Sequence, residues 1–376
     1  MKRMIYADNA ATTKLSKEAL LAMIPYLEEE YGNASQPYSF SKNVKKALRE
    51  ARETIASCIN ASPEEIFFTS GGTESDNWAV KGKMLEGRDR GSLITTQIEH
   101  HAILRSADAV EKMGHPVKYL PVDSSGKIDI KTFQKLLDKK TKLASIMYAN
   151  NEVGTIQPIK RLAMVAHEYG VLFHSDAVQA VGHVSIDVKD LDVDMLSASA
   201  HKFNGPKGTG FLYVKSGVHL NPFCDGGTQE FGKRAGTENV ASIVGMAIAL
   251  RNNCEKIEAH LQHLSLLEKE LLGGLNNSHI DYIRNGSEDH IPGNISLSFK
   301  GLDGEMLLHR LDLMGICVST GAACDSKETR VSHVLSAMKV PEEYAKGTIR
   351  ISLGKDNTLD EIEQIVEGLS RITGYY

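Results

Sequence analysis

The sequence contains few cysteines. Five occur in 376 residues, at positions 58, 224, 254, 317 and 324, and no two of them form a Cys-x-x-Cys pair. An odd number of cysteines without such pairs predicts neither a disulfide framework nor a zinc ribbon. We therefore expect reduced thiols, as in a cytoplasmic protein.

Long apolar stretches are also missing. No run of apolar residues approaches the ~20 residues that a helix needs to cross a bilayer. The basic residues near the N-terminus are not followed by the apolar core of a secretory signal. The sequence therefore predicts a cytoplasmic protein without a membrane partner.

Neither sign of charge dominates. The chain has 43 Lys and Arg against 48 Asp and Glu, a formal net charge of -5. This balance argues against a surface-wide footprint for nucleic acid, so we expect no direct nucleic-acid partner. Small anionic ligands would need dedicated local sites.

The pattern that is present is an alternation of strands and helices. Short apolar segments rich in β-branched or aromatic residues alternate with segments of helical periodicity. This rhythm predicts an α/β fold with a mostly parallel sheet flanked by helices, and ligands then bind beyond the carboxyl ends of the strands. The expected strands are residues 66–69, 93–96, 143–148, 171–173 and 210–214, and the clearest helices are 44–59 and 159–167.

The last third of the chain changes in style. A long helical segment is expected over residues 240–272, followed by turn-rich stretches near 285–287 and 292–294. Strands are expected at 295–299 and 349–353, and helices at 304–314 and from 359 onward. A chain of this length usually forms two domains or one with an appendage, so this part reads as a smaller α/β unit.

One lysine has surroundings suited to covalent chemistry. Lys202 lies among small residues, hydroxyls and an imidazole, just before a glycine-bounded turn. A lysine forms a Schiff base with an aldehyde such as pyridoxal phosphate only when its amine loses a proton, and partial burial lowers the pKa toward that state. The alternative is a solvated lysine at a strand-to-turn junction, which is our interpretation of Lys207.

A glycine-rich turn follows the strand expected at 66–69. In Ser70-Gly71-Gly72-Thr73-Glu74-Ser75, glycines and a hydroxyl precede a helix, whose exposed N–H groups and dipole suit a phosphate. The alternative is an ordinary helix start with Glu74 in the first turn. The segment is neither a Walker loop nor a complete dinucleotide fingerprint.

Two more strand ends carry candidate groups. Asp176 follows the strand expected at 171–173, where a carboxylate could keep a pyridinium nitrogen protonated, although an aspartate here could also cap a helix. In Glu99-His100-His101, one imidazole could lie on a cofactor ring and move protons. Adjacent histidines point in different directions and no second pair has helical spacing, so we expect no metal.

Cys324 lies in a stretch of small and polar residues, 319–327, which reads as a mobile loop. A thiol there can be exposed, and Lys327 or Arg330 could favour its thiolate, as a travelling nucleophile requires. The alternative is an inert, small hydrophobic residue.

These motifs occur together and in one order. The chain resembles the NifS/IscS-type cysteine desulfurases of the class V aminotransferase superfamily over nearly its full length. The segments that carry the resemblance are Asp8-Asn9-Ala10-Ala11-Thr12-Thr13, Tyr31-Gly32-Asn33, residues 70–75, Glu99-His100, Asn150-Asn151-Glu152-Val153-Gly154, Asp176-Ala177-Val178-Gln179 and Ala200-His201-Lys202.

The resemblance implies a fold-type I enzyme that depends on pyridoxal 5'-phosphate and works as a homodimer. Such an enzyme converts L-cysteine to L-alanine and takes the sulfur onto Cys324 as a persulfide. The expected domains are a large cofactor-binding domain, residues 14–256, and a small domain made of residues 1–13 and 257–376.

The resemblance also assigns roles to single residues. Lys202 would carry the Schiff base, His100 would stack on the ring and transfer protons, and Cys324 would accept the sulfur. Arg350, assisted by Asn151, would bind the substrate carboxylate. The remaining cofactor contacts would be Asp176 at the ring nitrogen, Gln179 at the ring oxygen, and Gly72, Thr73, Ser199, His201 and the other subunit's Thr237 at the phosphate.

Other functions stay open at this point. A selenocysteine lyase or a related class V transaminase would share most of these residues, and a sulfur-carrier subunit could retain the cofactor for structure alone. The sulfur acceptor would be an iron-sulfur scaffold or a tRNA-thiolation protein, between which the sequence does not choose.

Overall fold

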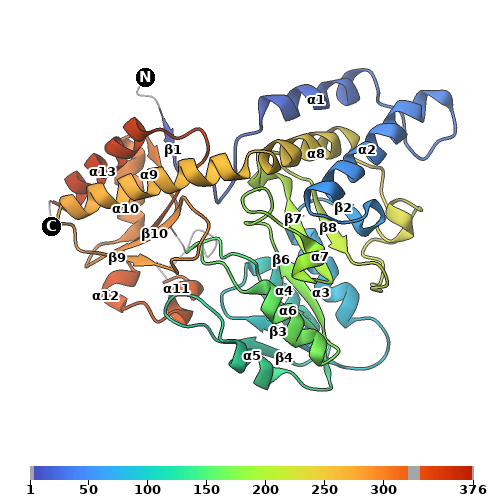
Figure 1. Ribbon diagram of the computed structural model, residues 1–376, viewed down its shortest axis with the longest axis horizontal. Helices are drawn as coiled ribbons and strands as arrows, with labels where there is room; N and C mark the ends of the chain where they lie inside the picture. Colours follow the sequence, from blue (N-terminus) through green and yellow to red (C-terminus); the bar gives the residue numbers. More distant parts are fainter. Residues whose placement is uncertain (1–3, 321–330, 375–376) are drawn as a thin grey trace.

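The computed structural model describes residues 4–320 and 331–374. Two α/β bodies lie side by side, and the long helix α9 (Ile257–Asn277) runs from one onto the other (Figure 1). The larger body holds a seven-stranded sheet and the smaller one a three-stranded sheet.

The large sheet confirms the predicted mostly parallel architecture. β8 is antiparallel to both of its neighbours, β2 and β7, and the other neighbouring strands pair in parallel. The strand order is β2 (Ile66–Thr69), β8 (Gly210–Val214), β7 (Met195–Ser199), β6 (Leu172–Asp176), β5 (Thr141–Ser145), β3 (Ser92–Thr96) and β4 (Val117–Leu120).

Helices cover both faces of this sheet because successive side chains of a strand point to opposite faces. One apolar cluster collects the strand residues under α2, α6 and α8, and a second collects their neighbours under α3 and α4. Phe68 and Phe67, for example, lie in different clusters. The helices of this body are α1 (Lys17–Glu28), α2 (Lys42–Cys58), α3 (Gly72–Met84), α4 (His101–Lys112), α5 (Ile130–Leu136), α6 (Ile159–Glu168), α7 (Val188–Leu191) and α8 (Val240–Cys254), with short 3-10 turns at Ser39–Ser41, Pro63–Glu65, Ala200–Lys202 and Glu230–Gly232.

The smaller body joins the beginning of the chain to its end. β1 (Ile5–Tyr6) pairs in parallel with β11 (Ile316–Cys317). The antiparallel sheet has the order β12 (Thr348–Ser352), β10 (Asn294–Phe299) and β9 (Tyr282–Asn285). Its helices are α9, α10 (Gly304–Leu313), α11 (His333–Ala337), α12 (Glu342–Ala345) and α13 (Leu359–Thr373). A separate apolar cluster runs through this body and includes Ile5 and Ala7, while the boundaries at residues 14 and 256 stay predictions.

The prediction of a single helix over residues 240–272 is wrong, because two helices occupy this stretch. α8 ends at Cys254, and Lys256, with φ -121° and ψ 12°, separates it from α9. The buried Asn253 side chain donates hydrogen bonds to the carbonyls of Phe203 and Ala249, both at 2.8 Å, which fixes the end of α8. α8 packs into the core of the large sheet and α9 into the core of the smaller body, so the chain turns between them.

In the large sheet, two strands were not expected and two had clearly different limits; in the smaller body, β1, β9 and β11 were not expected. β7 is made of Met, Leu, Ser and Ala, and β4 contains a lysine, so neither has the β-branched composition that predicts a strand. The strand expected at 143–148 ends at Ser145, and the one expected at 171–173 extends to Asp176.

Among residues 4–320 and 331–374, none of the helices combines the length and apolar character required to cross a lipid bilayer.

Candidate active site

Four strand ends meet at one edge of the large sheet. β2 and β7 are both antiparallel to β8, so they run in the same direction as each other and as β6, β5 and β3. The segments that follow β2, β3, β6 and β7 therefore lie along the carboxyl edge, where α/β sheets bind ligands. Those segments carry residues 70–73, 99–100, 176–179 and 200–202.

Lys202 lies in the 3-10 turn that follows β7. Its Nζ donates hydrogen bonds to the carbonyl oxygens of Ala10 and Ala11, at 2.6 and 2.9 Å. Its own carbonyl lies 2.9 Å from Nε2 of His183. The turn is thus held between the N-terminal segment and the chain after β6, with the amine at the sheet edge.

Asp176 and His100 lie near this lysine. Asp176 ends β6, is 5% exposed, and accepts a hydrogen bond from the N–H of Val178 at 2.9 Å. Burial raises the pKa of Asp176, and the nearby His100 and Lys202 oppose that rise. Burial lowers the pKa of His100, with Asp176 opposing and Lys202 adding to the effect, so the imidazole is neutral near pH 7.

The backbone decides which nitrogen of His100 is available. His100 is the N-cap of α4, and its Nδ1 accepts a hydrogen bond from the N–H of Ala102 at 3.2 Å. Nδ1 therefore carries no proton in the neutral ring, and the proton is on Nε2. The sequence did not show this capping bond.

The glycine-rich turn forms the start of a helix, as predicted. Gly71 has φ +144°, and α3 begins at Gly72 with Thr73 exposed. A Cβ placed on Gly71 would lie 3.4 Å from the hydroxyl oxygen of Ser199, so this hydroxyl lies beside the turn. The first N–H groups of a helix have no partner within it, which suits an anion.

His201 and Gln179 line the same region. Nδ1 of His201 lies 3.1 Å from the hydroxyl oxygen of Thr12, and burial lowers the pKa of His201 to about 4, which leaves a neutral ring. Gln179 donates from Nε2 to the carbonyl of Ala10 at 3.0 Å, the carbonyl that Lys202 also contacts.

Thr237 lies on the surface of this chain. It is exposed, and its segment is held near α3 by the ion pair of Arg234 with Glu74, with contacts of 2.8 and 3.1 Å. The side chain is therefore accessible from outside this chain.

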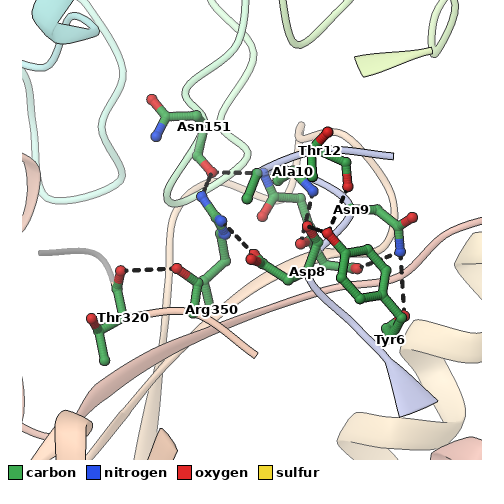
Figure 2. Close-up of polar contacts among 12 residues, drawn as sticks. Tyr6, Asp8, Asn9, Ala10, Thr12, Asn151, Thr320 and Arg350 are labelled. Atoms are coloured by element: carbon green, nitrogen blue, oxygen red, sulfur yellow. Dashed lines mark hydrogen bonds and ion pairs between the residues drawn. The ribbon is translucent and has the colours of Figure 1, made fainter. Parts of the chain in front are cut away.

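Arg350 reaches the site from the smaller body. It lies in β12, is 6% exposed, and contacts an oxygen of Asp8 at 2.7 Å and the backbone carbonyl of Asn151 at 2.9 Å (Figure 2). The Asn151 side chain points away from the guanidinium in this view. Nε of Arg350 is buried and has no hydrogen-bond partner among the residues that are described.

Several residues of the site had no predicted role. Asp8, Ala10 and Ala11 belong to the segment 8–13, which contributed to the family resemblance without an assigned role, and that motif was the available signal. Asp76, on α3, was not singled out, although its carboxyl oxygen lies within 4.8 Å of ligand atoms of both His100 and Asp176. The sequence offered little reason to assign Asp76 to the site, because a polar residue inside a helix usually faces solvent.

Cys324, Lys327 and Arg330 lie outside the described residues. The predicted sulfur-accepting loop is therefore known here by its sequence alone.

Comparison with known proteins places these residues in context. The model of the family "Aminotransferase class-V" matches residues 5–365. The chain is 46% identical to Cysteine desulfurase IscS of Clostridium botulinum (strain Hall), over 99% of this chain and 95% of the relative. It is also 46% identical to Cysteine desulfurase IscS of Dictyoglomus turgidum, over 100% and 98%.

Solved structures are similar to this chain over nearly its full length. A NifS-like protein superposes with a TM-score of 0.93 at 39% identity, covering 100% of both chains. A structure titled "SspA in complex with cysteine" superposes with a TM-score of 0.84 at 33% identity, covering 94% of this chain and 100% of that one.

Proposed function

The chain belongs to the aminotransferase class-V family, and we propose that its site performs the reaction of a pyridoxal phosphate-dependent cysteine desulfurase. Such an enzyme converts L-cysteine to L-alanine and retains the sulfur as a persulfide. The observation that carries the proposal is the meeting of Lys202, His100, Asp176 and the start of α3 at one sheet edge.

The residues present fit the cofactor. An amine at Lys202 matches its aldehyde, a buried carboxyl at Asp176 matches its ring nitrogen, and a neutral imidazole at His100 can stack on the ring. The turn at Gly72 and Thr73 with the hydroxyl of Ser199 suits its phosphate. His201, Gln179 and the other subunit's Thr237 would complete the contacts.

When bound, the cofactor withdraws electrons from the α-carbon of the amino acid attached to it. The chain supplies the proton handling. His100 is fixed by its Nδ1 bond to α4, so Nε2, which carries the proton of the neutral ring, is the atom that can donate a proton at the site. Its lowered pKa keeps the ring neutral near pH 7.

Arg350 would hold the substrate carboxylate. Two of its donors are engaged by Asp8 and the carbonyl of Asn151, while its buried Nε has no partner in the described part of the chain. A guanidinium has five N–H donors, so Nε and a neighbouring nitrogen can bind a carboxylate in a bidentate manner. The ion pair with Asp8 fixes the plane of the group.

Cys324 would accept the sulfur. Its thiolate attacks the sulfur of cysteine, a sulfur–sulfur bond forms as the carbon–sulfur bond of the substrate breaks, and the released carbon takes protons to become alanine. The persulfide then passes to an acceptor protein, either an iron-sulfur scaffold or a tRNA-thiolation protein.

The test is mass spectrometry of the protein after cysteine treatment, together with assay of alanine. The proposal expects one additional sulfur on Cys324 and loss of alanine formation from cysteine in Cys324→Ala. Sulfide release from cysteine at an unchanged rate in Cys324→Ala would contradict the persulfide step. Retained activity on selenocysteine in that variant would favour a selenocysteine lyase.

We also propose a homodimer in the cytoplasm. Large apolar side chains gather on the surface of α1 and nearby segments, as expected of a subunit interface. They include Leu21, Leu27, Tyr31 and Phe231, which are 56 to 73% exposed. The thiols of Cys58, Cys224, Cys254 and Cys317 are free, which suits a reducing compartment.

A further inference from the structure

A second buried carboxyl group, that of Asp76 on α3, lies beside the two residues that would contact the cofactor ring. Asp76 is 1% exposed. A carboxyl oxygen of Asp76, one of Asp176 and a ring nitrogen of His100 all lie within 4.8 Å of one another. Oδ1 of Asp76 is buried and has no hydrogen-bond partner in the part of the chain that is described. The proposed function gives roles to His100 and Asp176 but none to this third group.

The histidine that faces Asp76 brings no positive charge to it. His174, on β6, is 0% exposed, and its Nε2 lies 3.8 Å from Oδ1 of Asp76. Its two ring nitrogens are each 2.9 Å from a hydroxyl oxygen, Nε2 from that of Ser197 and Nδ1 from that of Ser145. Burial lowers the pKa of His174 to about 3, so the ring is neutral near pH 7. A negative charge on Asp76 would therefore not be offset by His174.

The other charged groups around Asp76 also disfavour a second negative charge. Before α4, Glu99 is 0% exposed and adds a further buried carboxyl group, whose pKa burial raises to about 8. After β7, Lys202 is the positive group of the site, and it lowers the pKa of Asp176. Two buried carboxylates this close repel each other strongly, so one of them keeps its proton. We therefore expect Asp76 and Asp176 to hold one proton between them.

The contacts of the two carboxyl groups decide which of them keeps it. Asp176 accepts the N–H of Val178 at 2.9 Å, a bond that stabilises its ionised form, whereas Oδ1 of Asp76 accepts nothing from the described residues. Burial, and after it the charge of Asp176, raises the pKa of Asp76 well above its ordinary value, although Ser197 opposes the rise. The proton therefore belongs on Asp76 and the negative charge on Asp176.

We propose that Asp76 is a positioning residue that stays protonated in the folded protein near neutral pH, so that Asp176 is the single charged carboxylate available to the ring nitrogen of the cofactor. The inference rests on the proposed function for the role of Asp176. It also concerns His100, because the charge of Asp176 already favours the protonated imidazole. A second charge at Asp76 would favour it further, so the proton on Asp76 helps to keep His100 neutral.

Infrared difference spectroscopy of the full-length chain near pH 7, without the cofactor, tests the proton directly. Asparagine has nearly the shape of aspartate and cannot ionise. The spectrum of wild type minus Asp76→Asn should therefore contain the C=O stretching band of a protonated carboxyl group. Glu230→Gln is the matched control, because Glu230 is a buried carboxylate, 4% exposed and 2.6 Å from Arg52, and its difference spectrum should contain carboxylate bands instead.

The holoenzyme tests the consequence for the cofactor. Asp176→Asn removes the charge, so it should shift the pH profile of the visible absorption band and weaken pyridoxal phosphate binding about tenfold or more. Asp76→Asn replaces one neutral group by another, so it should keep the wild-type pH profile and weaken binding less than about threefold. A purely structural role for Asp76 would not separate the two asparagine variants in this way.

Two results would overturn the proposal. One is the absence of the protonated-carboxyl band from the spectrum of wild type minus Asp76→Asn. The other is a shift of the pH profile in Asp76→Asn as large as that in Asp176→Asn, which would mean that Asp76 carries a charge. The infrared result decides the proton on Asp76 even if the wild type binds no pyridoxal phosphate, an outcome that would contradict the proposed function instead.

Discussion

Arg350 acts through contacts that a lysine could not reproduce. Its guanidinium is fixed by Asp8 and by the carbonyl of Asn151, and its Nε is buried without a described partner. An ammonium group retains the charge but loses the planar pair of donors. The geometry of the group, rather than its charge alone, is therefore what we expect to bind the substrate carboxylate.

We predict that Arg350→Lys raises the KM for cysteine about tenfold or more, with a smaller fall in kcat, because one charged hydrogen bond is lost. Initial rates of alanine formation over a range of cysteine concentrations measure both. Arg284→Lys is the matched control, since Arg284 is also ion-paired, with Glu268 at 2.7 Å, but lies outside the site. An unchanged KM in Arg350→Lys would remove this residue from the substrate site.

The sequence predicted residue types better than contacts. Asp176 and the turn at Gly72 could be recognised because each follows an apolar strand, and strand ends converge in this kind of sheet. Lys202 was recognised by the small residues, hydroxyls and imidazole around it in the sequence. Asp8 could not be assigned, since its partner Arg350 is 342 positions away. The capping bond of His100 was also hidden, because it depends on where α4 begins.

At the scale of elements, a buried ion pair ties α2 to the edge of the large sheet. The guanidinium of Arg52 binds both oxygens of Glu230, at 2.9 and 2.6 Å, and Glu230 also accepts from the N–H of Phe68 at 2.9 Å. The side chains are 14% and 4% exposed. Glu230 precedes the segment that holds Arg234 and Thr237.

Glu230→Ala should lower the free energy of unfolding by about 3 kcal/mol, because Arg52 would be left as a buried charge without its partner. Urea unfolding followed by fluorescence checks the value. Glu50→Ala, which breaks the exposed pair with Lys46 at 3.5 Å, should cost less than about 1 kcal/mol. Equal losses in the two variants would show that the pair contributes little.

A second prediction concerns the turn between β3 and α4. Burial raises the pKa of Glu99 from 4.5 to about 8, while bonds from Thr96 and the N–H of Met147 oppose the rise. Between these pH values the folded protein therefore binds a proton that the unfolded chain does not. The contribution of Glu99 to stability falls as pH rises from about 4.5 through 8, by about 1.4 kcal/mol per pH unit.

Glu99→Gln cannot titrate, so the free energy of unfolding of the wild type should fall steadily relative to that of this variant as pH rises across that window. Urea unfolding at several pH values measures it, and Glu111→Gln, at an exposed position on α4, is the control. A difference that does not change with pH would mean that Glu99 is ionised in the folded protein.

The elements themselves were predicted where local composition was decisive. β2, β8 and α6 were expected almost at their observed limits, since their apolar patterns are strong. The break between α8 and α9 was missed because it depends on Asn253 reaching Phe203 across the fold. β7 was missed because its small residues pack as a strand only when neighbours cover both faces.

At the scale of the whole molecule, the site is expected to need two chains. Thr237 is exposed on the surface of its own chain, which suits a phosphate contact across a dimer. A single chain would then lack part of its phosphate site.

Mixed dimers test this arrangement. Lys202→Ala and Thr237→Ala should each have low activity, but co-refolded mixtures should recover activity, because one site of the hybrid then contains both Lys202 and Thr237. Alanine formation after separation of differently tagged hybrids measures the recovery. Hybrids with no more activity than the parent variants would place Thr237 in its own subunit's site or outside any site.

Lys202 is the residue that we expect to hold the cofactor. Borohydride reduction of the purified holoenzyme, followed by digestion and mass spectrometry, should find the reduced pyridoxal phosphate adduct on the peptide that contains Lys202. An adduct on Lys207 or another lysine, with Lys202 unmodified, would contradict the account of the site.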